Sequence, residues 1–349
     1  MQAIDKSKPI LVTGGGGYIS SWIIKYLLED GFRVNTTVRD SSRKEKYSHL
    51  ESLKSSKDNL VIYEADLLKQ NSFLKSMKDC EIVIHTASPF FVTKINDPLK
   101  ELVQPAKEGT INVLSSVNQT PSVKRVVLTS SCASIYGDNI DIKFTKNGIF
   151  TEEYWNKTSS LEHNPYSFSK TIAEEEAWKI AKNQKRWDMI SINPAFVMGP
   201  ALSKRADSTS VQTMQHICNG TFFLGAPELW FGITDVRDVA RAHILAAFHE
   251  KAVGRHIISA DSLPMVKMAE IIKVKYPNKF LLPQSTIPYF LIWIFGPLLG
   301  FSHQYIEKNI GMKVAFDNTY TKEDLGLSFT NIEDTIWDHV EQLLRDGLL

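Results

Sequence analysis

The sequence has few cysteines, almost no net charge and no recognisable export signal. Its three cysteines, Cys80, Cys132 and Cys218, are too scattered for a disulfide framework or a CxxC metal site. Forty basic side chains against 39 acidic ones leave a formal charge of +1, which supplies no field for a nucleic-acid backbone or an anionic membrane. The first eight residues lack the apolar run of a signal peptide. We therefore expect no metal site, no nucleic-acid partner and a cytoplasmic location.

Long hydrophobic runs are also scarce, with one exception near the carboxyl terminus. The segment 280–302 contains no charged residue, and 287–301 is strongly apolar. Prolines and glycines interrupt it, and its dense part is shorter than the ~20 residues that a membrane-spanning helix needs. We expect a buried helix or a pocket lid there, rather than a membrane contact.

What the first half contains is an alternation of strand and helix patterns. Helical segments, such as 19–28, separate most of the short β-rich runs, which are 9–13, 33–38, 60–63, 81–85, 125–129 and 189–193. This alternation predicts an α/β fold, with a parallel sheet covered by helices on both faces.

The second half is more helical and irregular. We expect a nucleotide-binding domain over 1–195 and a smaller, mostly helical substrate-binding region over 196–349. A strand pattern at 256–259 indicates that some segments, about 230–260, return to the first domain.

A glycine-rich loop follows the first strand directly and opens a helix that begins near Tyr18 and Ile19. Gly14 and Gly17 occupy two positions of a G-x-x-G-x-x-G turn, and Ser20 occupies the third. Glycine lets the backbone turn tightly and lets a pyrophosphate approach the amides of the helix. The loop therefore predicts a dinucleotide site.

The end of the second strand indicates which dinucleotide binds. Arg39 lies where the adenine ribose is expected, and Lys46 follows shortly after. A guanidinium suits a 2′-phosphate, whereas a carboxylate would accept hydrogen bonds from a free 2′-hydroxyl. Asp40 stands one residue beyond the usual acidic position. NADP(H) is favoured over NAD(H).

Three polar side chains form a candidate catalytic set. Tyr166 and Lys170 are four residues apart at the start of a predicted helix, so they share one face. A nearby ammonium lowers the pKa of a phenol, which is otherwise ~10. Ser131 follows the strand 125–129, and strand ends of this kind build ligand crevices in parallel sheets. Its hydroxyl can bond to a substrate carbonyl.

The chain resembles the extended short-chain dehydrogenase/reductase family almost from end to end. The narrower resemblance is to the branch of dihydroflavonol 4-reductase, cinnamoyl-CoA reductase and microbial aldehyde and ketone reductases. The motifs that carry it are Val12-Thr-Gly-x-x-Gly17, Thr37-Val-Arg-Asp40, Ala65-Asp-Leu67, His85-Thr-Ala-Ser88, Thr129-Ser-Ser131, Tyr166-x-x-x-Lys170, Asn193-Pro194 and the run 235–243. The resemblance implies a Rossmann-type doubly wound parallel sheet.

The resemblance also implies roles for individual residues. Ser131 would hold the carbonyl, Tyr166 would donate the proton, and Lys170 would lower the pKa of that tyrosine. The cofactor-binding residues that it implies are Gly14, Gly17, Tyr18, Ile19, Arg39, Lys46, Asp66, Leu67, Ala87, Ser88, Tyr166, Lys170, Pro194 and Val197.

We therefore expect an NADPH-dependent reductase of an aldehyde or ketone, acting as a monomer or homodimer. A nucleotide-sugar epimerase, a hydroxysteroid dehydrogenase-like enzyme and a non-catalytic NADP-sensing protein stay open as alternatives. Residues 164–168 depart from the run typical of cinnamoyl-CoA reductases, which argues against CoA esters. Outside this set, we expect 174–176 to be a solvated helix face and His85 to be buried and hydrogen-bonded. Phe90 and Phe91 could line an apolar pocket or pack in the core.

Overall fold

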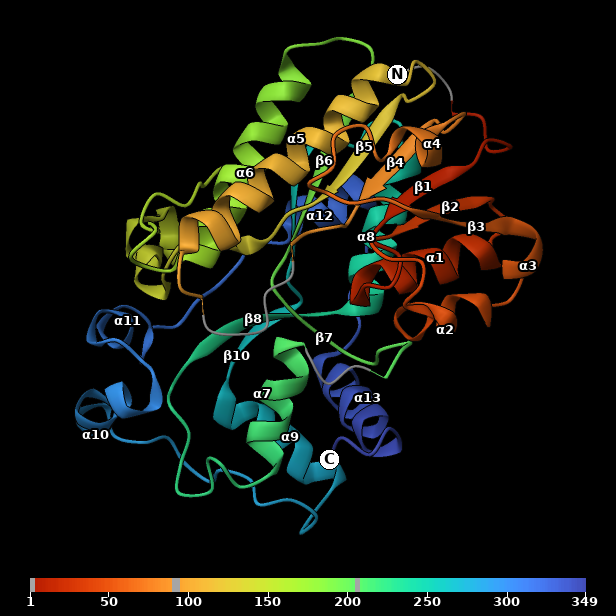
Figure 1. The fold of residues 1–349 in the computed structure, drawn as a ribbon. Coiled ribbons are helices and arrows are strands. Elements are labelled where there is room, and N and C mark those ends of the chain that lie inside the picture. Colours follow the sequence, from red (N-terminus) through yellow and green to blue (C-terminus); the bar gives the residue numbers. More distant parts are fainter. Residues whose placement is uncertain (1–3, 90–94, 205–207) are drawn as a thin grey trace.

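A seven-stranded parallel sheet forms the centre of the computed structural model, which describes residues 4–89, 95–204 and 208–349. The strand order is β3-β2-β1-β4-β5-β6-β9, and every neighbouring pair is parallel (Figure 1). The strands are β1 (Ile10–Thr13), β2 (Val34–Val38), β3 (Leu60–Glu64), β4 (Ile82–His85), β5 (Arg125–Thr129), β6 (Asp188–Pro194) and β9 (Gly254–Ile258). The predicted α/β class and the strand near residue 256 are confirmed.

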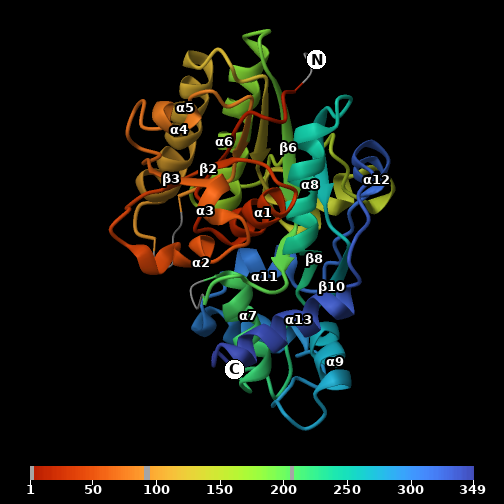
Figure 2. The same cartoon turned by 90° about the vertical axis from the view of Figure 1, so that its right-hand side faces the viewer.

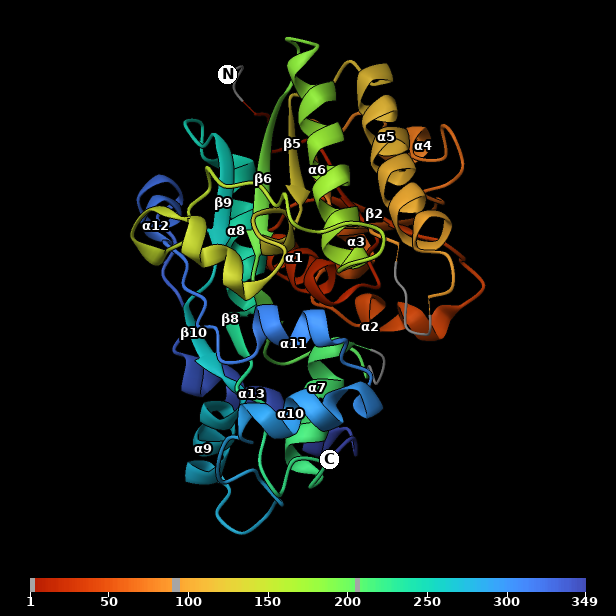
Figure 3. The ribbon, with the colours of Figure 1, turned by 90° about the vertical axis from the view of Figure 1, so that its left-hand side faces the viewer.

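Helices cover both faces of this sheet. The four long ones are α1 (Tyr18–Glu29), α5 (Gln104–Gln119), α6 (Pro165–Lys182) and α8 (Val236–Phe248). Figure 2 shows α1 beside α8, and Figure 3 shows α5 beside α6. Successive strand residues point to opposite faces. Val12 accordingly joins the core cluster of α1 and α8, whereas Leu11 joins that of α5 and α6.

Short turns complete the connections of the sheet. They are the 3₁₀ turns Lys44–Lys46, Cys132–Ser134, Asn139–Phe144 and Lys146–Gly148, the π turn Leu99–Val103, and the one-turn helices α2 (Ser48–Glu51), α3 (Ser56–Asn59) and α4 (Leu74–Met77). The turn Cys132–Ser134 packs against α6, which brings the end of β5 next to the start of that helix.

The carboxyl-terminal half builds a second hydrophobic core. Its helices are α7 (Thr209–Cys218), α9 (Met265–Lys275) and α13 (Ile332–Arg345), and α12 (Thr319–Leu325) packs against β9 and α8. Three strands that the sequence did not indicate form a second sheet here, namely β7 (Phe196–Met198), β8 (Trp230–Asp235) and β10 (Asp261–Pro264). Because β8 continues directly into α8, the chain returns from this sheet to the large one. The proposed division at residue 195 stays a prediction.

Most of the apolar segment 287–301 is exposed, so the expectation of a buried helix is wrong, while that of a pocket lid stays a prediction. It forms α10 (Tyr289–Phe295) and the 3₁₀ turn Gly296–Leu299, followed by α11 (His303–Asn309) (Figure 3). Ile292 is buried against Ile306. The exposed side chains are Tyr289, Phe290, Trp293, Ile294, Phe295 and Leu298. A seven-residue helix buries one face, and no other described element covers the rest. None of the helices among the described residues is both long and apolar enough to cross a membrane.

Candidate active site

The predicted site residues gather at one edge of the large sheet. Because its strands are all parallel, their carboxyl ends meet at that edge, where α/β folds bind ligands. The glycine loop 14–17 follows β1, Arg39 follows β2, and Asp66 and Leu67 follow β3. Ala87 and Ser88 follow β4, Ser131 follows β5, and Pro194 is the last residue of β6.

The glycine loop between β1 and α1 has no room for side chains. Gly14 has a φ of +70°, and a Cβ there would lie 3.0 Å from Ala87 Cα. A Cβ at Gly15 would lie 2.2 Å from Thr36 Oγ1, and one at Gly16 would lie 2.6 Å from the carbonyl oxygen of Lys46. Gly15 and Gly16 were not predicted to be essential, because the spacing pattern leaves those positions free. The packing explains why the chain has four glycines in a row.

Helix α1 begins directly after this loop, with Gly17 at its N-cap and no side-chain cap. The amides of the first turn therefore face the loop, where an anion such as a pyrophosphate can accept from them. Ser20 fills the third position of the motif and donates from Oγ to the carbonyl of Gly14 at 2.7 Å. This serine substitutes for glycine by bonding to the loop that it packs against. The cradle fits a dinucleotide.

The loop after β2 presents basic side chains. Arg39 and Lys46 are both exposed, and the backbone of Lys46 lies against the glycine loop. Asp40 accepts hydrogen bonds from the hydroxyl of Ser42 at 2.6 Å and from its amide at 2.9 Å. These bonds lower the pKa of the Asp40 carboxyl. Both bonds use Oδ1, so one of the two carboxylate oxygens of Asp40 is held toward its own loop.

The candidate catalytic tyrosine lies in the first turn of α6. Asn164 caps the helix in a left-handed conformation, φ 55°, and its side-chain amide donates to the carbonyl of Gly137 at 2.6 Å. Tyr166 is 52% exposed, and Lys170 Nζ lies 5.7 Å from the centroid of its ring. The ammonium therefore lies beside the tyrosine ring, and the catalytic roles of the two residues stay predictions.

Ser131 lies at the start of the turn that follows β5. Its Oγ accepts from the amide of Ala133 at 3.1 Å, and the residue is partly exposed. The hydroxyl proton is not used in that bond and is free for a ligand.

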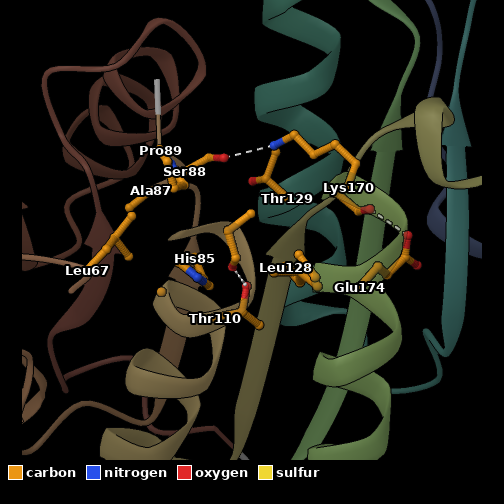
Figure 4. Close-up of a pocket in the computed structure, with 14 residues that line it drawn as sticks. Leu67, His85, Ala87, Ser88, Pro89, Thr110, Leu128, Thr129, Lys170 and Glu174 are labelled. Atoms are coloured by element: carbon orange, nitrogen blue, oxygen red, sulfur yellow. Dashed lines mark hydrogen bonds between the residues drawn. The ribbon is translucent and has the colours of Figure 1, made fainter. Parts of the chain in front are cut away.

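A cavity opens at the carboxyl ends of β4 and β5 (Figure 4). Leu67, Ala87, Ser88 and Lys170 are the predicted site residues that line it. Lys170 Nζ donates to Ser88 Oγ at 2.9 Å, as Figure 4 shows. The lining does not include Ser131 or Tyr166, and Phe90 and Phe91 lie outside the described residues.

His85 also lines this cavity. Burial lowers its pKa to about 4, so the ring is neutral at pH 7. Its Nδ1 shares a hydrogen bond of 2.9 Å with Thr13 Oγ1. The predicted buried, hydrogen-bonded histidine is confirmed.

The remaining predicted residues are placed as follows. Asp66 Oδ1 accepts from the amide of Leu68 at 2.9 Å, and the Tyr18 hydroxyl bonds to the carbonyl of Gly199. Ile19 packs against the core of α1 and α8, and Val197 lies in β7. Their roles toward a cofactor stay predictions.

Glu174 was expected on a solvated helix face, and this expectation is wrong. The residue is 1% exposed and pairs with Arg255, whose Nε donates to Oε1 at 2.7 Å. It follows Lys170 by four residues, so the spacing that places Tyr166 and Lys170 on one helix face also places Glu174 there. Extending that spacing by one turn would have found it.

Comparisons with known proteins give the family. The family model described as "NAD dependent epimerase/dehydratase family" matches residues 10–259. The chain belongs to this family. It is 38% identical over 283 residues to a cinnamoyl-CoA reductase of Medicago truncatula, covering 80% of this chain and 84% of that protein. It is 33% identical over 353 residues to tetraketide alpha-pyrone reductase 1 of Arabidopsis thaliana, covering 99% of this chain and 98% of that one.

A solved structure supports the same placement within the epimerase/dehydratase family. The yeast methylglyoxal/isovaleraldehyde reductase Gre2, complexed with NADPH, superimposes with a TM-score of 0.78 and 27% identity, covering 98% of this chain and 100% of that chain. The predicted extended short-chain dehydrogenase/reductase family, its reductase branch and the oxidoreductase class are confirmed.

Proposed function

We propose that this protein is an NADPH-dependent carbonyl reductase that acts on an aldehyde or ketone. The observation that carries the proposal is the position of Lys170, whose Nζ lies 5.7 Å from the ring centroid of Tyr166 and donates to Ser88 Oγ. Ser88 follows Ala87, which lies against Gly14 of the glycine cradle. Relatives and neighbours named as reductases support the same reaction class.

Each side chain has a role in this proposal. Bound NADPH supplies the hydride. Ser131 and Tyr166 hydrogen-bond to the carbonyl oxygen, and Tyr166 then gives its proton to that oxygen as negative charge develops there. Lys170 stabilises the phenolate that remains.

Several features support NADPH over NADH. Arg39 and Lys46 supply positive charge after β2, while the Asp40 carboxylate is bonded to Ser42. A guanidinium binds a phosphate through paired, charge-assisted hydrogen bonds. Yeast Gre2, which is similar to this chain, is described as complexed with NADPH.

The test is a cofactor-oxidation screen with NADPH and NADH over aliphatic aldehydes, aromatic aldehydes, α-diketones, dihydroflavonols and steroids. We expect loss of NADPH absorbance with at least one class. An epimerase would instead retain its nucleotide on purification and consume none, which would contradict the proposal.

The variant Tyr166→Phe assigns the proton donor. We expect it to lower kcat by about 10²–10⁴, because it removes the donated proton. The dissociation constant of NADPH, measured by fluorescence titration, should stay within about threefold, since the phenol ring is kept. Near-normal turnover of this variant would show that the assignment of Tyr166 is wrong.

A further inference from the structure

Glu174 lies at the centre of a buried polar cluster directly beside the candidate catalytic groups. Its Oε2 accepts from the hydroxyls of Ser130 and Ser134, both at 2.5 Å, and from Asn193 Nδ2 at 2.8 Å. Its Oε1 accepts from Arg255 Nε at 2.7 Å and from Trp178 Nε1 at 3.1 Å. Both carboxylate oxygens therefore have full sets of donors.

The partner of Glu174 is equally well bonded. The Nη1 of Arg255 donates to the carbonyls of Glu152 and Tyr154 at 2.9 and 2.6 Å. Its Nη2 lies 3.0 Å from Ser134 Oγ and 3.3 Å from Glu174 Oε2, and its guanidinium stacks 3.9 Å above the ring of Trp155.

Glu174 is ionised despite its burial. Burial by itself would raise the pKa of the carboxyl, but the charge and hydrogen bonds of Arg255, together with the hydroxyls of Ser130 and Ser134, lower it below its usual range. The protein therefore holds a complete ion pair in its interior.

The cluster ties together four segments that are distant in sequence. Glu174 belongs to α6, Arg255 to β9, Asn193 to β6, and Ser130 and Ser134 to the segment after β5. Ser131 lies within that last segment. Its carbonyl accepts from the Ser134 amide at 3.0 Å and from Asn193 Nδ2 at 3.2 Å. The backbone that presents the Ser131 hydroxyl is thus fixed by groups that are themselves bonded to Glu174.

We propose that Glu174 and Arg255 are positioning residues, which fix the turn that carries Ser131 against the helix that carries Tyr166 and Lys170. The inference rests on the proposed function, because it assigns the pair to the same reaction. Neither residue is assigned a contact with the reacting atoms, although Glu174 lines the cavity of Figure 4. They act through the serine turn and through α6, on which Tyr166, Lys170 and Glu174 follow one another at intervals of four residues.

Two physical arguments favour this role over a contribution to stability alone. A buried ion pair often stabilises a fold no better than apolar residues of the same volume, because desolvation cancels most of the attraction. Catalytic groups, however, must be held to within a fraction of an ångström, and only directional bonds fix two segments in that way.

The decisive variant is Glu174→Gln. The glutamine amide has the same shape as the carboxylate, but its NH₂ group donates hydrogen bonds and accepts none. In one orientation this NH₂ group faces the donors Arg255 and Trp178, and in the other it faces the donor Asn193. We expect the single-turnover rate constant for oxidation of bound NADPH, followed by stopped flow with the best carbonyl of the screen, to fall at least tenfold. The amplitude should match wild type. The control Glu175→Gln, an exposed position on the same helix, should change neither quantity.

This measurement separates positioning from partial unfolding. A smaller folded fraction lowers the amplitude and leaves the rate constant unchanged, and that result would overturn the inference. An unchanged rate constant would overturn it as well. If Glu174→Gln does not fold, Ser134→Ala decides, because it removes one uncharged member of the cluster. We expect a rate constant reduced at least threefold at full amplitude, and a normal rate would refute the proposal.

The variant Tyr166→Phe in the same assay distinguishes the two proposals. A fast Tyr166→Phe would contradict the proposed function itself. A slow Tyr166→Phe together with a normal Glu174→Gln would contradict only the positioning role.

Discussion

At the scale of single residues, the nucleotide cradle depends on positions where a side chain has no space. Gly14 combines a left-handed backbone with close contact to Ala87, a residue of the cavity wall. Any other side chain at residue 14 would therefore move the loop away from Ala87, and with it the amides that face a pyrophosphate.

The variant Gly14→Ala should weaken NADPH binding more than tenfold, because its Cβ forces the loop to shift. Gly31→Ala is the matched control. Gly31 also has a positive φ, +81°, but nothing lies within 4 Å of a Cβ there. Both variants should lose about 1–2 kcal/mol of stability through backbone strain. Fluorescence titration and urea unfolding measure the two effects. Equal affinity losses in both variants would contradict the cradle.

The cofactor preference is argued at the same scale. Arg39→Ala should weaken NADPH binding about 10- to 100-fold, the loss of one charge-assisted contact worth about 1.5–3 kcal/mol, and should change NADH binding little. Arg43→Ala serves as the control, since Arg43 pairs with Glu45 at 3.1 Å. If both nucleotides lose affinity equally, Arg39 does not contact the 2′-phosphate.

At the scale of elements, α10 is a helix of seven residues that few side chains hold in position. Ile292 is 6% exposed and Ile294 is 54% exposed, although both belong to the same apolar run. The contact of buried Ile292 with Ile306 and the stacking of Trp293 on His303 fix the helix to α11. Exposed side chains such as Ile294 contribute little to that packing.

Ile292→Ala should therefore destabilise the protein by about 2–4 kcal/mol, through lost burial and a cavity. Ile294→Ala should stay within about 0.5 kcal/mol of wild type. Thermal and urea unfolding of the two variants provide the comparison. Equal destabilisation would indicate that both side chains are buried.

The elements also show what could be predicted from the sequence. The strands of the large sheet and the glycine loop could be predicted from local patterns, because the alternation of strand and helix segments and the spacing of glycines are visible over short stretches of sequence. The spacing from Lys170 indicates which helix face Glu174 shares, but its burial could not be predicted, because its partner Arg255 is 81 residues away. The exposure of 287–301 could not be predicted either, since an apolar helix normally indicates burial and only tertiary packing decides what covers it.

At the scale of the whole molecule, stability should depend on buried histidines. Burial lowers the pKa of His85, His243 and His339 to about 4 each, from an ordinary value of 6.5. The unfolded chain therefore binds protons at a higher pH than the folded one. Their contribution is complete above pH 6.5 and is lost as the pH falls toward 4, by up to about 1.4 kcal/mol per pH unit for each ring.

We expect the urea midpoint to fall steeply between pH 6.5 and 4.5, a range above that in which most carboxylates titrate. The variant His339→Gln should reduce this slope by at most about one third, because one of these three rings is then absent while burial also lowers the pKa of His256. A midpoint that stays constant across this range would contradict the burial of these rings in solution.

The place of β9 at the edge of the large sheet has a consequence for synthesis on the ribosome. The strand that pairs with β6 is made more than 50 residues after it, and α8, which covers one face of the sheet, is also made late. A nascent chain that stops at residue 195 would leave β6 paired with β5 but open on the side that β9 covers, and part of the α1 face bare. We therefore expect the amino-terminal half to be prone to aggregation until a chaperone binds it or until synthesis has passed residue 258, where β9 ends.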